Sequence, residues 1–166
     1  QATAAASSSQ NQSKYEANVA SVAGKMDNRV IAAYQQLGFK IVVDPSVNYS
    51  GYFDARSRSI TMKQIDDSVY HELGHFLAFI AGNADKTASF QSIFATEKAN
   101  VTAFNKAYVT QNASEYFAES VKDYILNNAS LKSTRPQTYA AVQNALNQIT
   151  DAQIAKIQKI YGAFWN

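Results

Sequence analysis

The chain has 166 residues, of which 46% are hydrophobic, and this is enough for one domain with a buried core. Its net charge is +2, only 17% of its residues are charged, and no Lys/Arg run is present, which argues against nucleic acid and anionic membranes as partners. The absence of cysteine excludes disulfide scaffolds and thiolate metal sites. No apolar run approaches the roughly 18 residues that a membrane span needs.

The N-terminal segment is rich in Ala, Ser and Gln and shows no apolar periodicity. We therefore expect residues 1–13 to form a disordered leader and residues 14–166 to form a single domain. The sequence starts at Gln1 rather than at a methionine, as in a processed protein. The expected location is extracellular, after removal of a signal peptide that this sequence does not contain.

The domain is predicted to begin with a helix and a small sheet. Residues 15–37 carry apolar side chains at helical spacing and are followed by a glycine, which predicts an amphipathic helix. Short β-like segments follow at residues 39–43, around 49–53 and at 59–62. The polar residues 54–58 predict a hairpin turn between the last two strands.

A second helix is predicted from about residue 66 or 68 to about residue 81, before a glycine and an asparagine that give a stop signal. It contains H-E-L-G-H at residues 71–75, and with it both histidines of the chain. On a helix His71 and His75 share one face, one turn apart, as two ligands of a zinc ion do. Glu72 lies beside that face, in the position of a general base.

The glycine inside this motif is unfavourable in a helix. Gly74 costs roughly 1 kcal/mol relative to Ala, so another element is expected to pack closely against it. The alternative interpretation is that His71 and His75 are ordinary polar residues of a buried helix. Two histidines that flank a glutamate in the required register favour a metal site instead.

The rest of the chain is predicted to be helical, at about residues 87–96, 98–109, 114–127, 135–148 and 151–161. The expected fold class is therefore α+β. A small N-terminal helix and a short twisted sheet precede the H-E-x-x-H helix, and a helical C-terminal half follows it. This order of elements is zincin-like.

A catalytic zinc site takes three protein ligands and leaves one position for water, so the third ligand here must be Asp or Glu. Two carboxylate pairs have the i, i+4 spacing that would give one ligand and one partner for a ligand histidine. Spacing alone does not choose between these pairs, and a solvated acidic face is the other interpretation. The downstream candidates are Asp85, Glu97, Glu115, Glu119 and Asp123.

The joint pattern of the histidine motif, Tyr108, six further residues and E-Y-F-A-E at residues 115–119 resembles the family of anthrax toxin lethal factor, which includes the small secreted Pro-Pro endopeptidases. The resemblance spans residues 51–125. It implies that Glu115 is the third zinc ligand and that Glu119 supports a ligand histidine from outside. It also implies that Tyr108 directs its hydroxyl at the reacting carbonyl.

The same resemblance implies a secreted endopeptidase that binds one zinc ion and uses Glu72 as the base that activates water. Its partners would be protein or peptide substrates, with proline-containing peptides among them, and a monomer is the expected state. In zinc peptidases an edge strand beside the metal helix pairs with the substrate backbone. We expect Ile60, Thr61 and Met62 to form that strand.

Two other functions are open to a chain with this motif. One is a non-catalytic binding or toxin-associated module that keeps the metal site as a scaffold, although such a module has no use for Glu72. The other is a non-peptide amide hydrolase, such as a cell-wall amidase, which the resemblance to peptidases disfavours.

Overall fold

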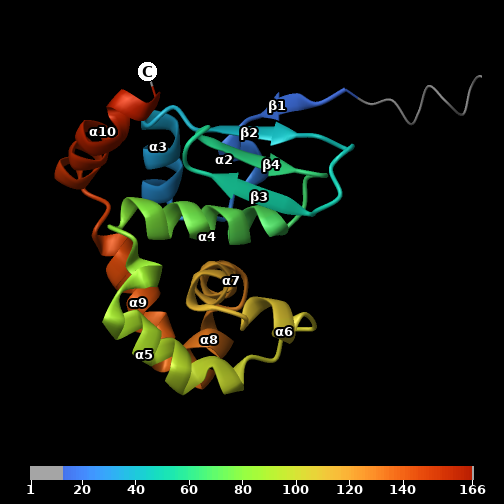
Figure 1. The fold of residues 1–166 in the computed structure, drawn as a ribbon. Helices are drawn as coiled ribbons and strands as arrows, with labels where there is room; N and C mark the ends of the chain where they lie inside the picture. Colours follow the sequence, from blue (N-terminus) through green and yellow to red (C-terminus); the bar gives the residue numbers. More distant parts are fainter. Residues whose placement is uncertain (1–12, 166) are drawn as a thin grey trace, which may run out of the picture.

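The computed structural model describes residues 13–165, and within them four strands form one sheet beside a larger set of helices (Figure 1). The α+β class is as predicted. The leader lies outside the described residues except for Ser13, and the single domain over residues 14–166 stays a prediction. The strands are β1 (Tyr15–Ala17), β2 (Lys40–Val43), β3 (Gly51–Asp54) and β4 (Ser59–Met62).

The strand order in the sheet is β1-β2-β4-β3. β2 and β4 run parallel, whereas β1 with β2 and β3 with β4 are antiparallel. The predicted hairpin is confirmed, since β3 and β4 are consecutive in the chain and pair with Gly51 opposite Met62 and Asp54 opposite Ser59. The parallel pairing places β4 inside the sheet and leaves β3 at its edge.

The predicted helix over residues 15–37 is wrong in its first half. The structure has β1 there, followed by α2 (Val19–Val22) and α3 (Asn28–Gln36). The side chains of Asn18 and Asp27 each accept a backbone hydrogen bond at a helix start, so two caps interrupt the apolar periodicity. Pairing of β1 with β2, a long-range contact, removes the first residues from the helix.

The helix that carries the histidine motif, α4 (Ser68–Ile80), has the predicted extent and ends just before Gly82, which adopts a φ of 76°. Its apolar stripe is buried, with Leu73, Phe76 and Leu77 at 0% exposure. Figure 1 shows α4 running beneath the sheet alongside β3. The sheet and this helix therefore share one core.

The C-terminal half is helical but not in the predicted segments throughout. Residues 98–109, predicted as one helix, form a short 3-10 turn and a short helix with an irregular segment between them. None of the helices among residues 13–165 is long and apolar enough to cross a membrane. The helices are α5 (Ala88–Glu97), α6 (Lys106–Val109), α7 (Ala113–Leu126), α8 (Asn128–Thr134), α9 (Pro136–Asn147) and α10 (Asp151–Trp165), with 3-10 turns η1 (Ala84–Lys86) and η2 (Lys98–Asn100).

α4 and α7 cross at Gly74. A Cβ atom at this position would lie 2.6 Å from the carbonyl oxygen and 2.8 Å from the Cα of Ala118. Figure 1 shows α7 nearly end-on beneath α4, on the side away from the sheet. The predicted close packing at Gly74 is therefore confirmed, and the packing partner is a helix backbone that cannot move aside.

Replacing Gly74 with Ala is expected to lower the free energy of unfolding by about 1–3 kcal/mol, although Ala is the better helix former, because the added methyl group overpacks the crossing. Urea denaturation measures this change. Gly162→Ala in α10 is the matched control, because its Cβ would meet only the flexible end of Gln158, at 3.2 Å. A Gly74→Ala protein as stable as the Gly162→Ala protein would contradict the steric argument.

Candidate metal centre

The crossing brings both histidines of α4 against a glutamate of α7. His71 Nε2 lies 2.9 Å from Glu115 Oε2, and His75 Nε2 lies 3.4 Å from Glu115 Oε1. One ligand atom from each of these residues lies within 4.8 Å of the other two. Ligand atoms about 2 Å from one tetrahedral zinc ion are separated by roughly 3.3 Å, so these three groups are close enough to share an ion.

Both ring nitrogens of His71 face carboxylates. Nε2 faces Glu115, and Nδ1 lies 2.7 Å from Glu119 Oε2. A neutral imidazole carries one N–H and cannot donate to both oxygens, so this geometry calls for a second proton or a cation on the Nε2 side. Two imidazole nitrogens and a carboxylate, with the second nitrogen of one ring held by another carboxylate, are a donor set that fits zinc.

When no metal is bound, His71 carries the second proton. Burial lowers the pKa of His71, but its hydrogen bonds with Glu115 and Glu119 outweigh burial and raise the pKa to about 9. Burial likewise acts to raise the pKa values of Glu115 and Glu119. The interactions with His71, joined at Glu115 by those with His75, outweigh burial and lower both pKa values. The three groups therefore form an ionised cluster that would otherwise suffer repulsion between its carboxylates.

Zinc affinity at this centre is expected to fall as the pH is lowered from about 9 to about 7, because a metal ion must displace the proton of His71, whose pKa is raised to about 9. Displacement of one proton per ion corresponds to about a tenfold loss of affinity per pH unit. Competition against a chelator of known pH dependence measures this slope. A flat profile over that range would contradict the raised pKa.

The other carboxylates that the sequence offers as candidate third ligands lie outside this cluster. Asp123 accepts a hydrogen bond of 2.6 Å from Arg135. Glu97 is buried and accepts the backbone N–H of Thr138 at 2.7 Å, at the start of α9. Asp85 is buried in η1. Among residues 13–165, the group that could hold a metal is the one formed by His71, His75 and Glu115.

Glu72 lies on α4 next to His71, and 93% of its surface is buried, since only 7% is exposed. This burial raises the pKa of its carboxyl group, and the nearby histidines only partly offset the effect. Gly51 of β3 makes room for it, because a Cβ there would lie 2.8 Å from Glu72 Cγ. The structure thus places a carboxylate with increased basicity beside the two histidines, as the motif predicts.

Tyr108 lies on α6, at the open side of the cluster. Its ring centroid is 6.4 Å from that of His71, and 54% of the residue is exposed. Partial burial raises the pKa of its phenol, and the negative charge of Glu115 raises it further. Tyr108 therefore keeps its proton at neutral pH and can act as a hydrogen-bond donor.

A hollow of 380 Å³ opens on the His71 side of the cluster, and His71, Glu72 and Tyr108 contribute to its lining. On one side it is bounded by Gly51, the first residue of β3. The predicted edge strand, Ile60, Thr61 and Met62, is wrong, because β4 lies between β2 and β3 and both Ile60 and Met62 are buried. The strand at the sheet edge beside this hollow is β3.

Comparison with known proteins places these residues in a family. The model of a family described as "Anthrax toxin lethal factor, N- and C-terminal domain" matches residues 54–145, more than half of the 166-residue chain. The chain belongs to the anthrax toxin lethal factor family. The resemblance predicted from the sequence is thereby confirmed, and the matched segment includes every predicted metal and catalytic residue from His71 to Glu119.

One protein similar to this chain is "Pro-Pro endopeptidase" from Clostridioides difficile (strain 630). It is 41% identical over 78 residues, which are 45% of this chain and 34% of that protein. The match thus covers about a third of the relative's length.

Several residues of the hollow escaped prediction in this member of the lethal factor family. Tyr49 and Ser50, which precede β3, contribute to its wall, as do Asn105 and Lys122. Lys122 had a local signal, because it lies three residues after Glu119 on the same helix. The other three lie in irregular segments whose position depends on long-range packing, so no local pattern identified them.

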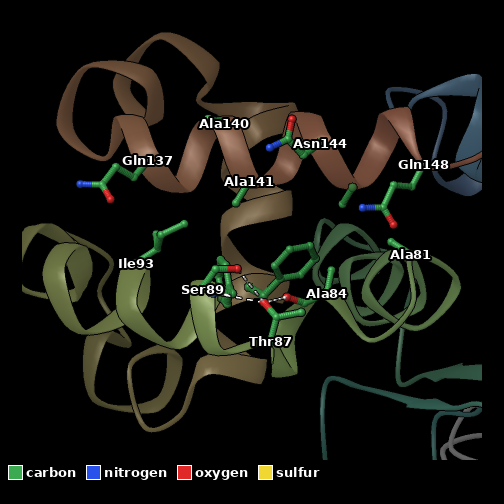
Figure 2. Close-up of a pocket in the computed structure, with 13 residues that line it drawn as sticks. Ala81, Ala84, Thr87, Ser89, Ile93, Gln137, Ala140, Ala141, Asn144 and Gln148 are labelled. Carbon is green, nitrogen blue, oxygen red and sulfur yellow. Dashed lines mark hydrogen bonds between the residues drawn. The ribbon is translucent and has the colours of Figure 1, made fainter.

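A separate cavity of 410 Å³ lies between α5 and α9, and Figure 2 shows the side chains that surround it. Small residues such as Ala140 and Ala141 face Ile93 across it, and the amide side chains of Gln137 and Asn144 come from the same helix. Its lining contains no titratable side chain. The titratable side chains described above therefore line the hollow beside α4 and not this cavity.

Proposed function

We propose that this chain is a secreted zinc-dependent endopeptidase. The observation that carries the proposal is the convergence of His71, His75 and Glu115 on one another, with Glu72 buried beside them. Membership of the lethal factor family and the likeness to a relative named Pro-Pro endopeptidase support a peptidase among the functions that such a site permits.

His71, His75 and Glu115 would hold the zinc ion, through Nε2 of each histidine and the carboxylate. When bound, zinc supplies Lewis acidity, which polarises a carbonyl group and makes a water molecule more acidic. Glu119 accepts the Nδ1 proton of His71 at 2.7 Å, which fixes the ring orientation and keeps Nε2 free to act as a ligand.

Glu72 acts as the general base and then as the general acid. It takes a proton from the water molecule that attacks the scissile carbonyl, and it passes this proton to the departing amine. Burial supports the first step, because the raised pKa makes the carboxylate a better proton acceptor than an exposed glutamate. Gly51 permits this placement because it has no side chain.

The substrate is a peptide in an extended conformation. Its backbone would pair with β3, the edge strand that begins at Gly51 beside the hollow, which is the β-augmentation mode of recognition. Peptides with a Pro-Pro bond are the first substrates to test, since the relative in Clostridioides difficile carries that activity in its name.

Tyr108→Phe is expected to fold and to bind zinc normally, while turnover falls about 10²- to 10³-fold, because the phenol donates to the oxyanion that forms on the substrate carbonyl. Steady-state kinetics with a fluorogenic peptide measure the loss. The matched control is Tyr15→Phe, which changes an exposed tyrosine on β1. Unchanged turnover in the Tyr108→Phe protein would show that this hydroxyl has no part in the reaction.

The decisive experiment exposes the purified protein to a peptide library that includes Pro-Pro sequences, with the products read by mass spectrometry. Cleavage is expected with zinc present, loss of cleavage after chelation, and recovery when zinc is returned. The Glu72→Gln protein serves as the control against contaminating proteases. Absence of cleavage by the zinc-loaded protein across the library would refute the proposal.

A further inference from the structure

The hollow over the metal centre adjoins a second and larger one. The second hollow has a volume of 450 Å³ and lies between the segment 101–105, α7 and α8. Asn105, Glu119 and Lys122 line both hollows. These three residues therefore form a boundary common to both hollows, and a peptide bound in the first hollow would bring its neighbouring side chains close to the second.

Most charged groups of the second hollow already have partners. Arg135 is buried and donates to Asp123 at 2.6 Å and to Ser120 at 3.1 Å. Glu119 accepts the Nδ1 proton of His71 at 2.7 Å. The remaining polar side chains of the lining are neutral amides and hydroxyls. Arg135 therefore offsets the charge of Asp123, and Glu119 is held between His71 and Lys122.

Lys122 is the cationic residue of this lining that keeps donors for a further partner, because within residues 13–165 it is paired with Glu119 alone. Its Nζ lies 3.7 Å from Glu119 Oε1, an ion-pair contact that is too long for a hydrogen bond. Its side chain is 29% exposed, so the ammonium group can also reach a ligand in the hollow. An ammonium group has three donors, and a carboxylate is the partner that satisfies them best.

We propose that the second hollow is a subsite for an acidic side chain of the peptide substrate, with Lys122 as the residue that binds its carboxylate. This inference rests on the proposed peptidase function and specifies its substrate class. The glutamate or aspartate would lie outside the two residues of the scissile bond, because the second hollow begins beyond the walls that Glu72 and Tyr108 give to the first.

Neutral or basic side chains suit this position less well. A basic side chain would meet the like charge of Lys122, and a neutral one would leave its donors to water. A hydrogen bond between charged groups in a partly enclosed site changes affinity by about 10- to 100-fold. The second hollow is therefore expected to discriminate between Glu and Gln, which have nearly the same shape.

The test uses a random decapeptide library and the zinc-loaded Glu72→Gln protein, which binds peptides without turning them over. Among the retained peptides, Glu is expected to be favoured over Gln at one position by about 10- to 100-fold. Adding Lys122→Gln should abolish the enrichment, and Lys122→Arg should preserve it. Lys132→Gln is the matched control, since this lysine lies over the ring of Tyr139, outside both hollows.

Two results would overturn the subsite. One is retention without acidic enrichment, or with an enrichment that survives Lys122→Gln. The other is an equal loss of Glu and Gln peptides in the Lys122→Gln protein together with reduced zinc content, which would show that Lys122 acts only through Glu119. Acidic enrichment in this binding experiment, combined with no cleavage by the zinc-loaded natural protein, would refute the peptidase proposal and leave the subsite standing.

Discussion

Glu72→Gln is expected to reduce peptide hydrolysis by about 10²- to 10⁴-fold, the usual contribution of a general base, while the protein keeps its zinc. Glutamine has nearly the same shape and can still form hydrogen bonds, but it cannot take a proton from water at neutral pH. The residue lies beside the three groups that converge on a metal position and is not one of them. Proton transfer is therefore what the substitution removes.

Turnover of a cleaved peptide and zinc content by elemental analysis are both needed for this prediction. Glu16→Gln on β1 is the matched control, because Glu16 is exposed and its side chain faces Lys40 far from the hollow.

Stability gives a third readout. Burial raises the pKa of Glu72, so the ionised carboxylate costs the folded state free energy once the pH exceeds the ordinary glutamate range. The Glu72→Gln protein should then be at least as stable at neutral pH.

Two outcomes would contradict the role of Glu72. Full activity in the Glu72→Gln protein would mean that another group accepts the proton. Loss of zinc together with activity would make Glu72 a ligand rather than a base.

Glu115→Ala is expected to lose zinc, whereas Glu119→Ala is expected to bind it 10- to 100-fold more weakly, as is typical when the outer partner of a ligand histidine is removed. Glu115 faces the Nε2 atoms of both histidines, at 2.9 and 3.4 Å. Glu119 faces only Nδ1 of His71, on the far side of the ring. The two glutamates lie on the same helix, so they form a matched pair for this comparison.

Zinc titration followed by chelator competition gives the two affinities, and circular dichroism checks that each variant is folded. Activity should follow zinc occupancy in both proteins, because neither glutamate is proposed to handle the proton. A Glu115→Ala protein that is fully loaded beside an empty Glu119→Ala protein would reverse the assignment of ligand and supporting residue.

The sequence predicts the structure and the site best where the signal is local. The extent of α4 follows from its apolar stripe and its stop signal, and the histidine motif within it needs only helical spacing. The choice between Glu115 with Glu119 and Glu119 with Asp123 is different, because it depends on which face of α7 meets α4. In the structure Asp123 faces Arg135, a residue twelve positions further along the chain, and no spacing rule contains that contact.

The errors lie where long-range pairing decides. Residues 15–17 carry an apolar pattern compatible with a helix, yet they form β1 because β2 offers them a strand partner. The sequence favours residues 60–62 as the edge strand because they lead into α4. The parallel pairing of β2 with β4 instead puts those residues inside the sheet and leaves β3 beside the hollow. Neither pairing leaves a trace in the local sequence.

The contact between Gly74 and Ala118 links the packing of the histidine motif to that of the glutamate pair. Gly74 lies between the two histidines, and Ala118 lies between the two glutamates. The two helices therefore touch inside both motifs. The variable positions of H-E-x-x-H and E-x-x-x-E are therefore not independent in this chain. A search for distant homologues should treat the two motifs as one unit, because a larger residue at Gly74 demands a wider spacing of the two helices that carry them.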